Sequence, residues 1–290
     1  MRQTTIKGSG GFATTLAVLG AVLAAGLAHT SAYAGPVQDR IALVGRYEAR
    51  FPNLKLDDYV NGVYALNPQM RAEWEQIMVF PPYLPGLQEG KKLFHTKFKN
   101  GKSYADCFPN GGIGIANTYP RWDAKRGEVM TLALAVNLCR KANSEKTLRY
   151  GKGKLAEILA YMADTAKGKK IHVVVPENDP RALEAYEHGK EFYYARRGQL
   201  NFSCASCHVQ YAGKRIRNNT LSPLLGQATH WPTYRLKWGA LGTLQRRFRG
   251  CNKQVRAKPF PFQSREYRDL QYFLTYMSNG LPEIGPTVRQ

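Results

Sequence analysis

The chain has 290 residues, and its 42 Lys and Arg against 21 Asp and Glu give a formal net charge of +21. So large a positive charge favours an anionic ligand, whether nucleic acid, a small anion or an acidic protein partner. Residues 35–290 are enough for one large domain or two small ones with hydrophobic cores. No stretch among them is long and apolar enough to cross a bilayer, which excludes a membrane span in this part of the chain.

The first 34 residues have the pattern of an export signal. Arg2 and Lys7 precede an Ala-rich apolar run over residues 12–27, and an Ala-Tyr-Ala cleavage sequence comes next. An uncleaved membrane anchor is the alternative, but the run is short and two threonines interrupt it. We therefore predict a signal peptide over residues 1–34 and a mature protein that begins at Gly35. In a Gram-negative cell its compartment is the periplasm.

Residues 35–85 form a leading segment, the N-terminal arm. Helices are predicted around residues 57–66 and 68–78, and prolines and a glycine over residues 81–86 separate the arm from the rest of the chain. We expect the arm to pack on the first domain and assign it no chemistry.

Beyond the arm, four features occur twice in the same order, which indicates an internal duplication. They are a helix with Gly-Lys and a phenylalanine, an aromatic–proline pair, a cysteine twenty residues later and a closing amphipathic helix. The first set is Gly90-Lys91, Phe94, Tyr119-Pro120, Cys139 and Leu155, Ile158, Leu159, Met162. The second set is Gly189-Lys190, Phe192, Trp231-Pro232, Cys251 and Leu270, Phe273, Leu274, Met277.

The stretch Cys204-Ala205-Ser206-Cys207-His208 is a CxxCH motif. Two thiols at this spacing can each form a thioether with a haem vinyl group, and the next residue then lies under the iron as its imidazole ligand. A CxxC redox pair or half of a zinc site is the alternative, but the chain has five cysteines and no second CxxC. The motif predicts one covalently bound haem c held by Cys204, Cys207 and His208. Because an exported haem protein has little use for nucleic acid, we expect no nucleic-acid partner.

We therefore predict a mainly α fold of two cytochrome c-like domains related by internal duplication, each with a cysteine-bearing loop between its opening and closing helices. Residues 86–175 form the haem-less domain and residues 176–290 the haem-binding domain. Asp179-Pro180, an N-cap followed by a first-turn proline, opens the second half. The first half has Cys107-Phe108-Pro109, which cannot hold haem by two thioethers, so only the second half binds it.

Three cysteines remain once haem has taken two. In an oxidising compartment this number suggests one disulfide and one thiol kept for a purpose. Cys107 and Cys139 lie in the same half, so we predict a disulfide between them, and Cys251 is the unpaired cysteine.

Cys251 stands in a strongly basic stretch. Residues 192–265 contain fourteen Lys and Arg and no Asp or Glu, and Arg246, Arg247 and Arg249 immediately precede this cysteine. Nearby cations stabilise thiolate over thiol, which makes the sulfur a better iron ligand and nucleophile. A buried inert cysteine and a solvated basic face are the alternative interpretations.

The haem iron needs a second axial ligand or an open position. Met277 and His230 compete with Cys251, but Met277 falls on the core-facing side of the closing helix, which favours packing. Ligation of the iron by Cys251 best explains why a free thiol stands in a basic part of a haem domain. Ligation by His and thiolate gives a low potential, suited to receiving electrons from a sulfur substrate.

The runs CASCHVQYAGKRIR, LSPLLGQATHWPTYR, RRFRGCNKQVRA and YMSNGLP resemble the A subunit of the Sox thiosulfate-oxidising cytochrome c complex, an L-cysteine S-thiosulfotransferase. The likeness extends over residues 80–289. Members of this family carry two haems or one, and the missing first CxxCH places this chain with the one-haem kind. In the one-haem members, a disulfide is expected at the position of the missing haem.

The resemblance implies that His208 and Cys251 are the axial ligands, the cysteine often being a persulfide, and that Arg247 is the active-site arginine. Residues i and i+4 share a face of a helix, so this guanidinium can approach both the sulfur and a bound dianion. The implied reaction joins thiosulfate to a cysteine of the carrier formed by subunits Y and Z, and the small cytochrome c subunit X takes the two electrons onward. The alternative is a pure electron-transfer cytochrome.

Overall fold

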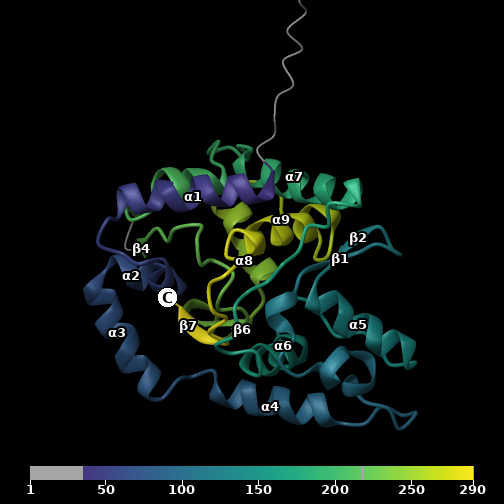
Figure 1. The fold of residues 1–290 in the computed structure, drawn as a ribbon. Coiled ribbons are helices and arrows are strands. Elements are labelled where there is room, and N and C mark those ends of the chain that lie inside the picture. The colour runs from purple at the N-terminus through teal and green to yellow at the C-terminus, as the bar shows by residue number, and fades with distance from the viewer. Residues whose placement is uncertain (1–34, 217–218, 290) are drawn as a thin grey trace, which may run out of the picture. The chain divides into compact units, whose positions relative to one another are not determined.

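The computed structural model describes residues 35–216 and 219–289, so the predicted signal peptide lies outside the described residues. These are mostly helical, as predicted (Figure 1). The α-helices are α1 (Pro36–Arg50), α2 (Val63–Leu66), α3 (Pro68–Val79), α4 (Leu84–His95), α5 (Leu132–Ala142), α6 (Lys154–Asp164), α7 (Pro180–Tyr194), α8 (Leu244–Gln254) and α9 (Arg265–Tyr276). Short 3-10 turns are Leu56–Asn61, Tyr104–Cys107, Pro109–Gly112, Ala116–Thr118 and Leu236–Trp238, and Ser206–Gln210 is a π-helical turn.

The strands are short and form small sheets. They are β1 (Arg121–Asp123), β2 (Glu128–Met130), β3 (Arg215–Ile216), β4 (Asn219–Thr220), β5 (Thr233–Arg235), β6 (Ala240–Gly242) and β7 (Thr287–Arg289). The pairs β1–β2, β3–β4 and β5–β6 are antiparallel. Strand β7, the last of the chain, pairs with β5 in parallel, which places Arg289 opposite Arg235.

Each half contains a pair of helices that cross with almost no space between them. Helix α4 crosses α6 at Gly90, where a Cβ would lie 1.9 Å from the carbonyl oxygen of Glu157. Helix α7 crosses α9 at Gly189, where a Cβ would lie 2.1 Å from the carbonyl oxygen of Asp269. Only glycine allows backbones to approach this closely. The repeated Gly-Lys sequences therefore mark helix crossings.

The predicted closing helices are confirmed as α6 and α9. The apolar residues that indicated them, from Leu155 to Met162 and from Leu270 to Met277, are each at most 5% exposed. The predicted helix start at Asp179-Pro180 is also confirmed, because α7 begins at Pro180 and the Asp179 side chain accepts from Arg181 N. Both signals are local, because an N-cap is encoded within one helical turn and an apolar helix face within a few turns.

The expectation that the two cysteines of the duplicated pattern lie in loops is wrong, because both lie in helices. Cys139 belongs to α5 and Cys251 to α8. Each helix comes after a β-hairpin, and each is capped by a threonine, Thr131 or Thr243, whose hydroxyl accepts from a backbone N–H in the first turn. Such caps stabilise a helix N-terminus by roughly 1 kcal/mol. The basic sequence around Cys251 therefore presents its side chains at helical spacing.

A disulfide joins Cys107 and Cys139 in the first half, as the cysteine count had suggested. It connects the 3-10 turn Tyr104–Cys107 to α5. Asn143 caps the C-terminus of α5, where its Nδ2 donates to the Cys139 carbonyl at 2.9 Å. The surrounding core contains Phe94, Tyr104 and Met162, each at most 1% exposed. The first half is therefore closed by a disulfide and aromatic packing.

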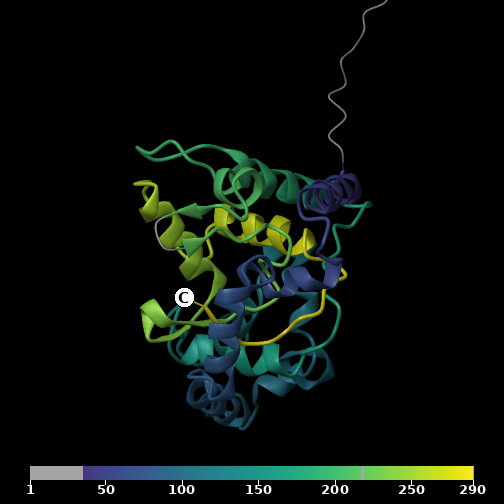
Figure 2. The same ribbon diagram turned by 90° about the vertical axis from the view of Figure 1, so that its left-hand side faces the viewer.

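The N-terminal arm differs from its prediction in two ways. Helix α1 was not foreseen, and the expected packing on the first domain is wrong for this helix. Leu43 and Tyr47 of α1 and Tyr59 belong to the hydrophobic core of the second half, and α1 lies alongside α7 (Figures 1 and 2). The helix predicted at residues 68–78 is confirmed as α3, while the one predicted at 57–66 is divided at Gly62, whose φ is +57°.

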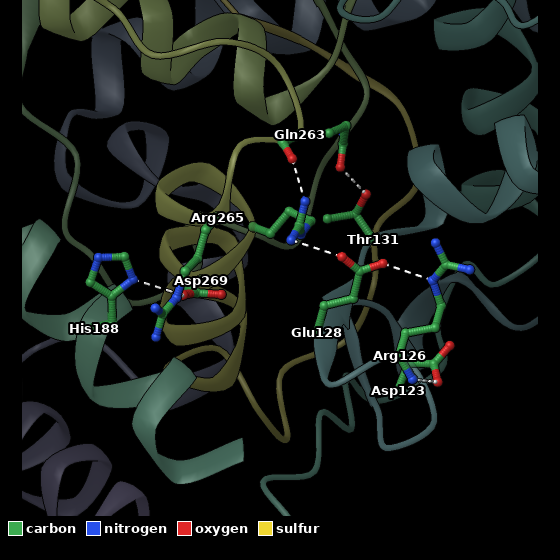
Figure 3. Close-up of polar contacts among 9 residues, drawn as sticks. Asp123, Arg126, Glu128, Thr131, His188, Gln263, Arg265 and Asp269 are labelled. Carbon is green, nitrogen blue, oxygen red and sulfur yellow. Dashed lines mark hydrogen bonds and ion pairs between the residues drawn. The ribbon is translucent and has the colours of Figure 1, made fainter. Parts of the chain in front are cut away.

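Polar contacts join the two halves where β2 approaches α9 (Figure 3). Glu128 accepts from Arg268 at 2.9 Å, and the Thr131 hydroxyl donates to the Gln263 side chain at 2.8 Å. Nearby, His188 of α7 lies 2.7 Å from the buried carboxylate of Asp269 in α9. Because these groups lie on separate elements, they fix how β2, α7 and α9 pack against one another.

Candidate functional site

The CxxCH motif is held at its start by two serine side chains. The amide of Ser206 donates to Ser203 Oγ at 2.9 Å, and the amide of Ser203 donates to Ser206 Oγ at 3.2 Å, so each hydroxyl caps the other's backbone. Both serines are buried, as are Ala205 and Val209, which pack into the core. The remaining side chains, Cys204, Cys207 and His208, are half-buried, and Cys204 packs against the same core.

The imidazole of His208 is oriented by a backbone carbonyl. Its Nδ1 lies 2.8 Å from the Ser222 oxygen, and because a carbonyl only accepts, Nδ1 carries the proton. Burial, together with the smaller effect of the Arg247 charge, lowers the pKa of His208 to about 4. The ring is therefore neutral at pH 7, with the lone pair of Nε2 available to a metal. A hydrogen bond of this kind orients metal-bound histidines in general.

The cysteines of the motif are thiols and not thiolates. Burial raises the pKa of Cys204 to about 12 and also raises that of Cys207, and the nearby Cys251 contributes to both shifts. A dithiol redox pair and a zinc site both need a lowered thiol pKa. Among the described residues, no three His, Cys, Asp or Glu side chains gather as a metal-ion site. Raised thiol pKa values therefore argue against a redox dithiol and against zinc-bound thiolates.

Helix α8 presents Cys251 and Arg247 together. Leu244, Phe248 and Asn252 form its buried face, while Arg247 and Cys251 are half-buried one turn apart. Arg247 acts electrostatically on His208 and Cys207, and Cys251 acts on both motif cysteines. The structure thus brings together the residues predicted from the sequence as the haem and sulfur site.

Neighbouring arginines of α8 have structural partners, whereas the Arg247 side chain has none among the described residues. Arg246 stacks over Trp238 at 4.2 Å from the ring centroid. Arg249 donates to the Phe260 carbonyl and lies 4.9 Å from the centroid of the Phe262 ring. The backbone amide of Arg247 donates to the Thr243 carbonyl, but within the described part of the chain its side chain makes no hydrogen bond or ion pair. Its guanidinium is therefore available to an anion beside Cys251.

The sequence reasoning missed Arg235 and Arg289, which add to this positive charge. They are neighbours across the parallel β5–β7 pair, and Arg289 stacks over Tyr64 of the arm at 4.7 Å. Burial, and for Arg235 the charge of Arg247, lower the pKa of both guanidinium groups to about 10. Nothing in the sequence signals this pairing, because 54 residues separate the two positions and only the sheet joins them.

The other two candidate ligands have packing roles in the described structure. Met277 is 1% exposed and lies in the hydrophobic core of the second half. His230 is buried and stacks on Trp231 with ring centroids 5.6 Å apart. Burial, followed by the charge of Arg289, lowers its pKa. Neither finding favours ligation over packing.

These donors fit a c-type haem. Two protonated thiols stand beside a neutral imidazole with free Nε2, a third sulfur lies nearby, and several guanidinium groups can neutralise carboxylates. Cys204 and Cys207 would hold such a group covalently, and His208 and Cys251 would supply ligand atoms to its iron. When bound, haem supplies a one-electron acceptor next to Cys251.

Comparisons with known proteins agree with this chemistry. The profile of the family described as SoxA/TsdA, cytochrome c domain matches residues 89–171 and 188–282. The chain is 51% identical to the L-cysteine S-thiosulfotransferase subunit SoxA of Allochromatium vinosum over 95% of this chain and 97% of that protein. It is 49% identical to the subunit of that name from Chlorobaculum tepidum over 86% of each.

A solved structure is similar as well. The crystal structure of SoxXA from P. pantotrophus aligns with a TM-score of 0.66 and 32% identity, covering 72% of this chain and 79% of that one.

Between residues 35 and 289, leaving out 217 and 218, no helix is long and apolar enough to span a membrane.

Proposed function

This chain belongs to the SoxA/TsdA cytochrome c family, and we propose that it is a SoxA-type subunit of an L-cysteine S-thiosulfotransferase. It joins thiosulfate to a cysteine of a sulfur-carrier protein and passes the two electrons to a partner cytochrome. The single observation that carries this proposal is the position of the Arg247 guanidinium, which has no hydrogen-bond or ion-pair partner among the described residues and lies one helical turn from Cys251. An electron relay needs no such group.

In the proposed reaction Cys251 carries the sulfur and Arg247 holds the dianion. A new S–S bond forms between the Cys251 thiolate and the terminal sulfur of thiosulfate, with loss of two electrons. The thiolate of the carrier cysteine then attacks that terminal sulfur, takes the S-sulfonate group and releases the Cys251 thiolate. Atoms and charge balance over the two steps: carrier thiol and thiosulfate give carrier S-thiosulfonate, one proton and two electrons. The guanidinium of Arg247 orients the sulfonate oxygens throughout.

Two variants test these roles. Cys251→Met should keep the covalent haem, because the two motif cysteines are untouched, but should change the low-spin electron paramagnetic resonance (EPR) signal and raise the potential. A neutral thioether stabilises ferric iron less than a thiolate does. Thiosulfate turnover should be abolished. Arg247→Ala should lose about 10²–10³-fold in turnover with a nearly unchanged haem spectrum, as expected when one preorganised donor is removed.

Lys253→Ala provides the matched control, because Lys253 is an exposed cation on the same helix. Its turnover should stay near wild type. Unchanged EPR and full activity in Cys251→Met would contradict both proposed roles of that residue. Altered ligation with full activity would leave the pure electron-transfer cytochrome as the better interpretation.

We propose one haem per chain, bound by the second of two duplicated cytochrome c-like domains, residues 86–175 and 176–290. The repeated glycine crossings, the repeated hairpin and threonine-capped helix, and the two segments that the family profile matches support the duplication. The disulfide between Cys107 and Cys139 supports a haem-less first half. Two haems in a pyridine haemochrome assay, or free thiols at both positions on alkylation, would contradict the proposal.

The proposed partners are the small cytochrome c subunit X, in a heterodimer, and a carrier of subunits Y and Z. The similar SoxXA crystal structure supports the first. The proposed compartment is the periplasm, reached by means of the signal peptide over residues 1–34. Amino-terminal sequencing of the mature protein from an osmotic-shock fraction should begin at Gly35. Recovery of uncleaved chain in the cytoplasm would contradict this localisation.

A further inference from the structure

The N-terminal arm, to which the sequence assigned no chemistry, contacts the backbone of the haem motif directly. Tyr47 of α1 is fully buried, and its hydroxyl donates to the carbonyl of His208 at 2.5 Å. The same hydroxyl accepts from the amide of Leu224 at 2.9 Å. It therefore bridges the segment that carries His208 and the segment just beyond Ser222.

A second side chain of α1 binds the next two carbonyls. Nη1 of Arg50 donates to the oxygens of Val209 at 3.1 Å and Gln210 at 2.7 Å. The last carbonyls of a helical turn have no partner within the turn and need one from elsewhere. Three consecutive carbonyls of the π-helical turn thus accept from α1, and that of His208 also accepts from the Leu224 amide at 2.9 Å.

The arm is also pressed against the facing segment. A Cβ at Gly226, whose φ is +81°, would lie 2.0 Å from the Tyr59 carbonyl oxygen, so arm backbone and segment backbone are in direct contact. The Thr229 hydroxyl lies 3.3 Å from the carbonyl of Val60. The loop from Ser222 to Thr229 therefore has little freedom to move away from the arm.

These contacts act on the hydrogen bond that orients the imidazole. His208 Nδ1 donates to the Ser222 carbonyl, and Tyr47 joins the backbones that carry both partners, at His208 and two residues beyond Ser222. The length of the Nδ1 hydrogen bond sets how basic a metal-bound imidazole is, and so how strongly it stabilises ferric iron.

We propose that Tyr47 and Arg50 are positioning residues for the proximal ligand His208, which makes the N-terminal arm part of the haem site. Tyr47 holds the His208 and Ser222 segments together and Arg50 holds the two carbonyls that follow His208, and together they keep the imidazole strongly basic and the potential low. The proposal rests on the proposed function only in assigning a haem to His208, and the assay below needs neither thiosulfate nor a carrier.

The test compares two buried tyrosines of the arm whose rings pack against each other at a tilt, with centroids 5.7 Å apart. Tyr47→Phe removes the bridging hydroxyl. Tyr59→Phe is the control, because the Tyr59 hydroxyl is buried without a hydrogen-bond partner among the described residues. Arg50→Gln and the exposed Arg46→Gln form a second pair on α1. Exported holoprotein of each is titrated spectroelectrochemically, and its ferric EPR spectrum is recorded.

We expect Tyr47→Phe and Arg50→Gln to raise the potential and shift the low-spin g values while the covalent haem is retained. Tyr59→Phe and Arg46→Gln should match the wild type in both measurements. A lower melting temperature with unchanged potential and g values in both Tyr47→Phe and Arg50→Gln would overturn the proposal and leave α1 a purely structural helix. Should Tyr47→Phe fail to fold, Arg50→Gln decides alone. Failure of the sulfur-transfer proposal would appear separately, as activity retained in Cys251→Met.

Discussion

Replacing Gly189 with alanine should separate the two helices that enclose the second half. The new Cβ would lie 2.1 Å from the carbonyl oxygen of Asp269, 2.5 Å from its carbonyl carbon and 3.0 Å from Phe273 Cβ. Because the obstacle is backbone, no side chain can turn aside, and α7 and α9 must part by roughly 1 Å, which forfeits up to about half of each dispersion contact between them. Overpacking of this kind costs about 3 kcal/mol or more. Alanine returns about 1 kcal/mol through helix propensity, so the net loss is at least about 2 kcal/mol.

The measurement is thermal unfolding of exported holoprotein followed by far-ultraviolet circular dichroism. At about 2–4 °C per kcal/mol for a chain of this size, Gly189→Ala should melt at least about 4 °C below the wild type. Gly45→Ala is the matched control, because Gly45 lies in α1 with no atom within 4 Å of its added Cβ. It should melt about 2–4 °C higher through propensity alone. If Gly189→Ala melts at or above the wild type, the helices have room to spare and the crossing argument is refuted.

Three further outcomes are expected. Replacing Cys107 and Cys139 together by alanine opens a loop with a sequence separation of 32, which should lower the free energy of unfolding in urea by about 3–4 kcal/mol; an unchanged value would show that the closed loop contributes no stability. Burial raises the pKa of Glu283 well above its ordinary value, so the folded protein binds this proton more tightly than the unfolded chain does, and stability present at low pH is lost as pH rises through the folded-state pKa. The melting temperature of the wild type should therefore fall as pH rises, and in Glu283→Gln the part of this fall that is due to Glu283 should disappear. Identical plots of melting temperature against pH for the two proteins would argue against a buried protonated carboxyl. The KM for thiosulfate should rise with salt, because charges more than about 10 Å apart are screened at 0.1 M; a flat response would favour a merely solvated basic face.

Local chemistry made several features readable from the sequence. The CxxCH spacing specifies covalent haem attachment because the two thiols and the imidazole lie within five residues. The faces of α6 and α9 were predicted because apolar residues at helical spacing must be buried, and both sets are. The Asp179-Pro180 helix start was predicted because capping needs only neighbouring residues. The disulfide partners were predicted from the cysteine count and the duplicated pattern, without any knowledge of distances.

Tertiary structure decided the rest, because those features depend on surfaces that meet only after folding. Helix α1 carries no signal for which half it joins, and only the packing of Tyr47 into the second core places it on the haem motif. Arg235 and Arg289 become neighbours through a parallel strand pair that closes the chain over 54 residues. Local propensity cannot encode the pairing of β5 with β7, because it reflects only neighbouring residues. The entropy cost of closing the long loop between the two strands is offset only by contacts that form in the folded chain. The sequence by itself therefore determined which groups are proposed to do the chemistry, and only the folded chain decided which backbone and which charges surround them.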